Sequence, residues 1–289
     1  MVKPKVVYLG NCQAEAMASI AIFFGLDQNP VTLPPIWTLT DNDRAKIEGA
    51  YKEADYIFLQ RVDGSFPVTF VKSEYVRNLV PRTPVITWPN IYFDGYFPGI
   101  RYLYGPKGKI VGPLSDYHFD WIIETFRKKL ALEETQEYLI NIFNEKYATP
   151  AEDSIRNLIA REKDTDAKIS DYIQTYFRHE KLFYTMNHPA TIVIVEMLRR
   201  LHNVVNLRFL ETSLDTFPYH LNSIDIGCLP IFNSKYHPTF QTQELIKGLK
   251  ISPDGTTPLQ DQPAYYKLQE LIRIYYSIYS SHFDLFQTV

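Results

Sequence analysis

The chain has 289 residues, of which 45% are hydrophobic and 22% are charged, and its formal net charge is −3. These proportions are typical of a globular protein, and the length allows one large domain or two small ones. A slightly acidic chain without a long basic run is poorly suited to binding the phosphate backbone of DNA or RNA. We therefore expect no nucleic-acid partner.

The N-terminal third alternates short apolar runs with segments of helical periodicity. It predicts strands at 5–9, 55–60 and 84–88, helices at 14–26, 41–53 and 70–79, and a Pro-broken extended piece at 31–39. Strands separated by helices are typical of βαβ units with a parallel sheet, and such sheets bind ligands beyond the carboxyl ends of their strands. We therefore expect residues 10–12, 60–61 and 88–90 to share one crevice.

Residues 89–113 are rich in Pro, Gly and Tyr and predict a long functional loop. Beyond it the periodicity predicts helices at 115–130, 133–146, 150–161, 167–177, 191–202 and 264–286, while 203–257 is of mixed character. We expect an α/β protein with an N-terminal parallel sheet of Rossmann or SGNH type (1–113). A mainly helical region (114–289) would follow and cover the crevice; the alternative is one continuous domain.

Cys12 and Cys228 are the only cysteines, which does not indicate a disulfide framework and favours a reducing compartment. The residues before Cys12 resemble a lipoprotein cleavage box, but Asn11 stands where a small residue is required, and the apolar run is too short for a signal peptide. No apolar stretch is long enough for a transmembrane helix. We therefore expect a cytoplasmic protein with no membrane span.

Cys12 lies in Gly10-Asn11-Cys12-Gln13, between the first predicted strand and the first predicted helix. A thiol at a helix N-terminus is close to free N–H groups that stabilise anions. We expect a depressed pKa and a nucleophilic sulfur, with the same N–H groups able to hold an oxyanion. A small buried cysteine at a strand end is the alternative, and position alone does not decide between them.

Two histidines are candidate bases. His118 follows a predicted helix start capped by Ser115 or Asp116, and His188 precedes the helix predicted at 191–202. A helix N-terminus favours neutral imidazole, the form that a general base requires. Asn187 is either a helix cap or a substrate ligand. A cysteine with distant histidines is typical of nucleophilic acyl transfer.

Other chemistries lack their motifs. The sequence has no CxxC, HxxxH or HExxH pattern, so we expect no metal, and it has no Walker or GxGxxG loop. Basic residues near the strand ends and in the Gly-rich loop are candidate phosphate ligands, namely Arg61, Arg101, Lys107 and Lys109. For the two lysines, an ordinary solvated turn is the favoured alternative. Candidate oxyanion or substrate ligands are the amides of Asn11, Gln13, Gln60 and Asn90.

Five segments, in this order, resemble the WcbI-type capsular polysaccharide biosynthesis enzymes: residues 10–13, 54–60, 89–98, 116–118 and 187–189. The resemblance extends over about residues 5–200. It implies a protein that binds coenzyme A, with Gly10 at the cofactor site, and that moves an acetyl group from acetyl-CoA onto a capsule sugar. The opening motif also resembles the Gly-Asp-Ser block of SGNH hydrolases with Cys in place of Ser, but their Asp-x-x-His block is missing.

The leading hypothesis is therefore an acyl-CoA-dependent O-acyltransferase with a carbohydrate acceptor. Cys12 would take the acyl group as a thioester, and His118 or His188 would act as the base. In a variant of this hypothesis, histidine activates the sugar directly and Cys12 only binds. The alternatives are an SGNH-like carbohydrate esterase and a non-catalytic polysaccharide-assembly protein.

Overall fold

A computed structural model of the chain describes residues 3–26, 28–209, 217 and 221–282. The chain forms two compact units, each built from segments that are distant in the sequence. Unit 1 contains Met1–Tyr92, Ile155–Tyr176 and His188–Leu221, and unit 2 contains Phe93–Ser154, Phe177–Asn187 and Asn222–Val289. The boundary predicted between residues 113 and 114 falls inside the first segment of unit 2.

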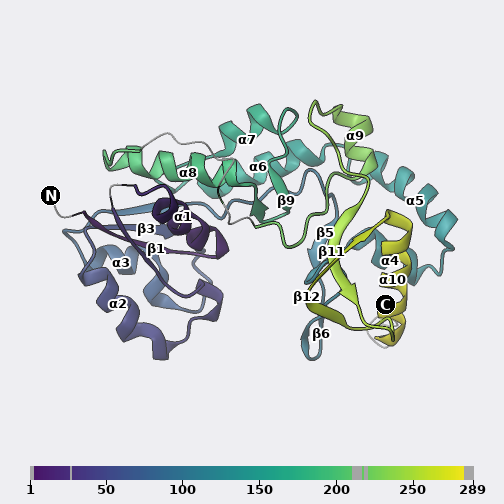
Figure 1. Ribbon diagram of the computed structural model, residues 1–289, viewed down its shortest axis with the longest axis horizontal. Coiled ribbons are helices and arrows are strands. Elements are labelled where there is room, and N and C mark those ends of the chain that lie inside the picture. Colours follow the sequence, from purple (N-terminus) through teal and green to yellow (C-terminus); the bar gives the residue numbers. More distant parts are fainter. Residues whose placement is uncertain (1–2, 27, 210–216, 218–220, 283–289) are drawn as a thin grey trace. The chain divides into compact units, whose positions relative to one another are not determined.

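Unit 1 is organised around a four-stranded parallel sheet (Figure 1). Its strands, in the order β2-β1-β3-β4, are β2 (Asn29–Thr32), β1 (Lys5–Leu9), β3 (Tyr56–Gln60) and β4 (Val85–Trp88). The parallel sheet predicted from the apolar runs is therefore confirmed. The extended piece predicted at 31–39 contains the end of β2 and a short 3-10 turn, η1 (Ile36–Thr38).

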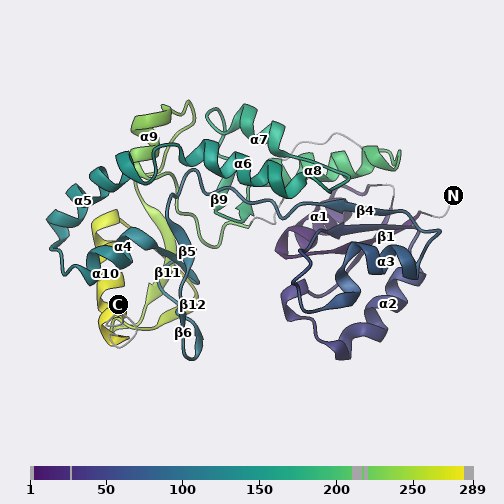
Figure 2. The ribbon, with the colours of Figure 1, turned by 180° about the vertical axis from the view of Figure 1, so that it is seen from behind.

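Side chains alternate between the two faces of this sheet, as the strand period of two requires. One face presents a cluster that includes Val7, Leu9, Ile57 and Leu59, which packs with buried residues of α2 (Arg44–Lys52) and α3 (Ser73–Leu79). The other face carries Tyr8 and Phe58, whose rings meet edge to face at 5.3 Å. On that side lie α1 (Cys12–Phe23) and α8 (Thr191–Val204), as Figures 1 and 2 show.

The free edge of β4 is covered by the connection between α6 (Pro150–Glu162) and α7 (Ser170–Tyr176). The N–H groups of Asp166 and Ala167 both donate to the carbonyl oxygen of Thr87, each at 3.0 Å. The Asp166 carboxylate accepts from the N–H and the hydroxyl of Thr87, both at 2.7 Å. These contacts satisfy backbone groups that an open sheet edge would leave unpaired.

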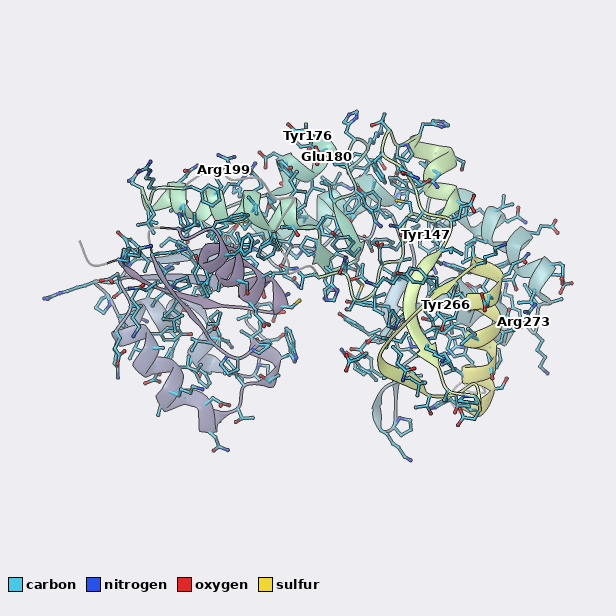
Figure 3. The ribbon with its side chains drawn as sticks, in the orientation of Figure 1. Tyr147, Tyr176, Glu180, Arg199, Tyr266 and Arg273 are labelled. Carbon is cyan, nitrogen blue, oxygen red and sulfur yellow. The ribbon has the colours of Figure 1, made fainter. Side chains whose placement is uncertain are left out.

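Unit 2 combines short antiparallel strand pairs with helices (Figure 1). β5 (Ile100–Tyr102) pairs with β8 (Tyr117–Phe119), β6 (Tyr104–Gly105) with β7 (Gly108–Lys109), and β11 (Ile246–Ile251) with β12 (Pro258–Tyr266). Tyr266, labelled in Figure 3, donates across the last hairpin to the carbonyl oxygen of Leu249 at 2.6 Å. The long helix α10 (Leu268–Ser281), which carries Arg273 (Figure 3), packs on α4 (Asp120–Arg127) and α5 (Leu132–Glu145).

The remaining elements are short: η2 (Asp41–Asp43), η3 (Thr69–Val71), β9 (Phe183–Thr185), β10 (His188–Pro189) and α9 (Pro230–Tyr236). In the described part of the chain, no helix combines the length and the apolar character needed to cross a membrane.

Two helix predictions in unit 2 were wrong at their starts. The helix predicted from residue 115 begins at Asp120, because Tyr117–Phe119 pairs with β5 and Ser115 has a φ of 57°. The helix predicted from residue 264 begins at Leu268, because residues up to Tyr266 belong to β12. Its predicted end, 283–286, lies outside the described residues. In both segments tertiary strand pairing outweighs a helical sequence pattern.

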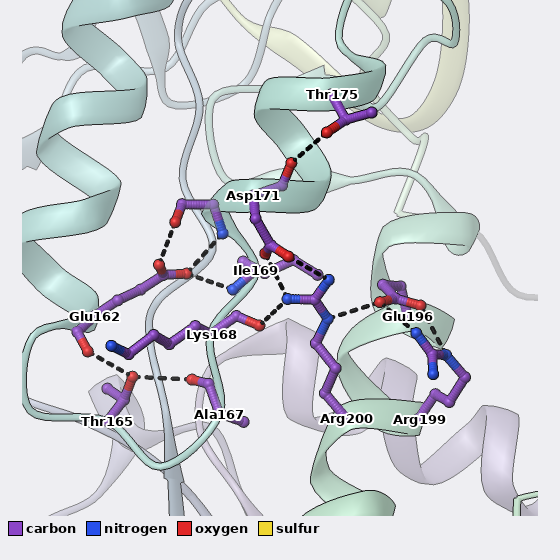
Figure 4. Close-up of polar contacts among 11 residues, drawn as sticks. Glu162, Thr165, Ala167, Lys168, Ile169, Asp171, Thr175, Glu196, Arg199 and Arg200 are labelled. Atoms are coloured by element: carbon purple, nitrogen blue, oxygen red, sulfur yellow. Dashed lines mark hydrogen bonds and ion pairs between the residues drawn. The ribbon is translucent and has the colours of Figure 1, made fainter.

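Glu162, the last residue of α6, is a buried carboxylate with a full set of donors (Figure 4). It accepts from the N–H groups of Ile169 and Ser170, at 2.5 and 2.9 Å, and from the Ser170 hydroxyl at 2.5 Å. The carboxylate therefore caps the start of α7, where N–H groups have no partner inside the helix.

We predict that Glu162→Ala lowers the free energy of unfolding by about 3 kcal/mol, because it leaves buried donors without an acceptor. Urea denaturation monitored by circular dichroism measures the loss. Glu53→Ala is the matched control, since that carboxylate is exposed and forms only a surface ion pair with Lys5, which contributes little. Equal stability of the wild type and Glu162→Ala would contradict the capping role.

Candidate functional site

The turn from β1 to α1 begins at Gly10, where the chain passes close to the neighbouring strand ends. A Cβ atom on Gly10 would lie 2.9 Å from Cβ of Gln60, 3.0 Å from the Trp88 ring and 3.1 Å from Cβ of Ala14. Contacts this short require the side chain to be absent. Gly10 thus allows the ends of β1, β3 and β4 to meet.

Asn11 is the N-cap of α1, and Cys12 is the first helical residue. The side-chain oxygen of Asn11 accepts from the N–H of Gln13 at 3.0 Å, and its carbonyl oxygen accepts from the N–H of Ala14 at 2.9 Å. This is the arrangement that Asn favours at a helix start. The prediction that the thiol lies at a helix N-terminus is confirmed.

A network of amides joins this turn to the ends of β3 and β4. The N–H of Asn11 donates to Oε1 of Gln60 at 2.9 Å, and Nδ2 of Asn11 donates to Oδ1 of Asn90 at 3.0 Å. Gln13 pairs with the backbone of Ile91 through both ends of its amide, at 2.8 and 3.1 Å. The structure therefore brings together the three segments that the sequence predicted at one sheet edge, and Gln13 and Gln60 hold them there.

The Cys12 thiol is only partly exposed, and its pKa differs from the prediction. Burial raises the pKa to about 11, while the N–H groups of Cys12 and Gln13 lower it and the Glu15 carboxylate raises it further. The expected depressed pKa was therefore wrong. Desolvation of the thiolate outweighs the N–H groups of the helix start.

His188 belongs to unit 1, like Cys12, and immediately precedes α8, which begins at Thr191 as predicted. Burial lowers its pKa to about 4, against a smaller opposing effect of a hydrogen bond with the Leu221 backbone. The ring is therefore neutral at pH 7, the form a base requires.

His118 lies on β8 in unit 2 and is fully buried. Its Nδ1 is 2.8 Å from the Tyr279 hydroxyl and its Nε2 is 2.9 Å from the Ile110 carbonyl oxygen. Burial lowers the pKa of His118 to about 4 as well. Both ring nitrogens are thus engaged inside unit 2, so accepting a substrate proton would require one of these contacts to break.

The predicted phosphate ligands differ in their surroundings. Arg61 forms an ion pair with Asp164 at 3.0 Å. Lys109 pairs with Asp116 at 2.6 Å and lies 4.2 Å from the ring centre of Tyr102. Lys107 is exposed between β6 and β7, and Arg101 is exposed on β5.

Asn187 lies in unit 2 and is held by tyrosines. Its Oδ1 accepts from the Tyr117 hydroxyl at 2.6 Å, and its Nδ2 donates to the Tyr102 hydroxyl at 3.2 Å. The Tyr102 and Tyr117 rings stack at 5.5 Å. These contacts account for the Asn187 side chain without a capping role.

Arg161, near the end of α6, contacts the segment that follows β4 and was not among the predicted site residues. Its guanidinium lies 4.8 Å from the ring centre of Tyr92 and donates to the Tyr92 carbonyl oxygen at 3.4 Å. Tyr92 directly follows the segment that binds Asn11 and Gln13, but no motif in the sequence links it to residue 161. Within the described ranges there is no group of three or more His, Cys, Asp and Glu residues arranged to hold a metal ion.

We predict that Gly10→Ala destabilises the protein by about 1–3 kcal/mol, because the added methyl group overpacks the junction of three strand ends. Gly49→Ala is the matched control: no atom lies within 4 Å of its added Cβ, in the interior of α2. The free energy of unfolding of that control should rise by about 0.5–1 kcal/mol, because Ala favours the helix more than Gly does. Urea denaturation compares the two variants, and a neutral Gly10→Ala would contradict the tight junction.

We also predict that alkylation of Cys12 by iodoacetamide accelerates about tenfold per pH unit from pH 7 to 10 without a plateau, because the reactive thiolate is a minor species below the pKa. That pKa is about 11. Peptide mapping by mass spectrometry separates Cys12 from Cys228. A plateau near pH 8 would show a thiol ionised at physiological pH and contradict the dominance of burial.

The chain was compared with known protein families, curated proteins and solved structures. No curated protein matches the chain. A solved structure described as WcbI, a novel polysaccharide biosynthesis enzyme, matches 99% of this chain and 90% of its own, with a TM-score of 0.73 and 19% identity, which supports the α/β fold. It is described as the native protein without the disulfide bond between coenzyme A and a cysteine. Residues 5–210, most of the chain, match the family of the polysaccharide biosynthesis enzyme WcbI, and the protein belongs to that family.

Proposed function

We propose that the protein is an acyl-CoA-dependent O-acyltransferase that moves an acyl group, most simply acetyl, onto a hydroxyl of a surface or capsular sugar. The observation that carries the proposal is the partly buried Cys12 thiol at the first position of α1, with two N–H groups beside its sulfur. The family match to a polysaccharide biosynthesis enzyme supports the carbohydrate acceptor. Two free cysteines suit the cytoplasm, where we propose the reaction takes place.

Coenzyme A as the donor is supported by the structural neighbour, which is described as the native protein without a disulfide bond between coenzyme A and a cysteine. We propose that Cys12 lies beside the thioester of the bound acyl-coenzyme A. Exchange between two thioesters is nearly thermoneutral, so a thiol is a suitable acceptor for the acyl group.

In the first step, Cys12 Sγ forms a bond to the acyl carbon, and the bond from that carbon to the coenzyme sulfur breaks. The proton lost by Cys12 leaves with the coenzyme thiol. In the second step, the sugar hydroxyl oxygen bonds to the acyl carbon and the Cys12 thioester bond breaks. The hydroxyl proton returns to Cys12, so the enzyme ends as it began.

A base is needed in the first step because the Cys12 pKa of about 11 leaves only roughly one thiol in ten thousand ionised at pH 7. In the second step the base takes the proton of the sugar hydroxyl as its oxygen attacks the acyl carbon. We propose His188 as this base, since it is neutral at pH 7 and belongs to the same unit. His118 lies in unit 2 with both ring nitrogens engaged, and its role as a base stays a prediction from the sequence.

The oxyanion that forms in each step needs fixed donors. The N–H of Cys12 lies at the helix start, and Nδ2 of Asn11 has a second hydrogen besides the one it donates to Asn90. We propose these two groups as the oxyanion donors. Gln13, Gln60 and Asn90 then act by holding the turn in place.

The coenzyme phosphates require positive charge, and we propose Arg61 for that role, since it lies in unit 1 with Cys12 and would exchange Asp164 for a phosphate. Arg101, Lys107 and Lys109 lie in unit 2, where their role as phosphate ligands stays a prediction, as does that of Asn187 as a substrate ligand. Gly10 acts by allowing the three strand ends to pack together.

We predict that coenzyme A at one hundred times its dissociation constant raises the midpoint of thermal unfolding by a few degrees, equivalent to about 2.7 kcal/mol. Cys12→Ala should keep this shift but lose transferase activity by about a thousandfold or more, because the acyl acceptor is removed. Intact-mass measurement after acetyl-CoA should detect acyl-Cys12 in the wild type only.

Cys228→Ala is the control, because it removes the other thiol, which is buried in unit 2. It should keep the coenzyme shift and the activity. Near-full activity of Cys12→Ala would reject the covalent route and leave direct transfer by histidine. Turnover of aryl acetates without any coenzyme requirement would instead identify an esterase.

A further inference from the structure

Trp37 lies at the same sheet edge as Cys12. The chain leaves β2, passes Pro34 and Pro35 and enters the η1 turn, where the N–H of Ile36 donates to the carbonyl oxygen of Gly10 at 3.0 Å. This hydrogen bond ties the turn to the residue that precedes the N-cap of α1. Trp37 therefore directly follows a residue that is hydrogen-bonded to the turn between β1 and α1.

The Trp37 indole is exposed although the turn that carries it is firmly held. The residue is 59% exposed, whereas Trp88 and Trp121 are fully buried. Ile36 and Leu39 on either side are buried in the apolar cluster beneath the sheet. The structure thus presents a flat aromatic surface on a fixed support, which loses little conformational entropy when a ligand binds.

The residues that follow Trp37 are polar and acidic. Asp43 accepts from the N–H and the hydroxyl of Thr40, at 2.8 and 3.1 Å, and Asp41 pairs with Arg44 at 3.1 Å. Arg44 and Lys46 balance the two carboxylates, so this stretch has no net positive charge to attract phosphate groups. Hydroxyl and carboxylate oxygens instead complement the hydroxyl groups of a neutral sugar.

We propose that Trp37 forms the acceptor subsite, where its indole stacks on the apolar face of a neutral pyranose and holds a sugar hydroxyl toward the acyl group on Cys12. Aromatic faces pack against C–H surfaces while the sugar hydroxyls remain free for hydrogen bonds at the rim. This inference rests on the proposed transfer to a sugar. Trp37 thereby belongs to the binding site of the acceptor sugar and not to that of the coenzyme.

The test uses the full-length protein and a panel of neutral methyl pyranosides. Because Trp37 is the exposed indole, acrylamide quenching of tryptophan fluorescence reports on it. At least one panel sugar, at high millimolar concentration, should protect the wild type from quenching and accelerate acyl-CoA consumption. Trp37→Ala should raise the KM for that sugar about tenfold, which corresponds to the loss of one aromatic contact, and Trp37→Phe should recover part of the loss.

Phe23→Ala is the matched control, because Phe23 is an exposed aromatic residue of unit 1 at the far end of α1 from Cys12. It should leave the sugar KM unchanged. Trp37→Ala should also keep the thermal shift with coenzyme A, which shows that the variant folds and binds the donor. An unchanged sugar KM in Trp37→Ala, or quenching that no panel sugar reduces, would overturn the acceptor subsite. Failure of the wild type to bind coenzyme A would overturn the proposed function instead.

Discussion

The hydrogen bonds of Asn11 are the constraint on which the rest of the site depends. Asn11 caps α1 with its side-chain oxygen, donates from its side-chain nitrogen to Asn90 and donates from its backbone N–H to the side-chain oxygen of Gln60. The three contacts join the ends of three strands, and no other residue type of similar size offers both a donor and an acceptor in one planar group. The direction of the first turn of α1, and hence of the Cys12 thiol, follows from them.

The same packing that fixes the thiol also keeps it protonated. Gln13 and Gln60 are buried at the turn, and Nε2 of Gln60 donates to Oε1 of Gln13 at 3.4 Å. A thiolate formed there loses hydration that two N–H groups do not replace, which is why burial dominates its pKa. A resting thiol of this kind resists oxidation and alkylation, and its reactivity depends on a base at the moment of transfer.

Local patterns in the sequence predicted the parallel sheet, the position of Cys12 at a helix start and the meeting of three strand ends, because apolar runs, a Gly turn and helical periodicity are read from neighbouring residues. Three features depended on distant contacts. The pairing of Gln13 with Ile91 joins residues 78 positions apart, the strand at Tyr117–Phe119 requires β5 as its partner, and the burial that raises the Cys12 pKa requires the whole sheet. The distribution of both units over separate segments is likewise invisible to local periodicity.

The cover of the β4 edge has a consequence for the order in which the protein is made. The N–H groups that bind the Thr87 carbonyl oxygen belong to Asp166 and Ala167, about 80 residues later in the chain. At a translation rate of roughly 5–20 residues per second, the nascent sheet waits on the order of 4–16 s before that segment is synthesised. During that interval the N-terminal strands have an open edge, so the cell must keep a nascent intermediate from pairing with another chain on the ribosome.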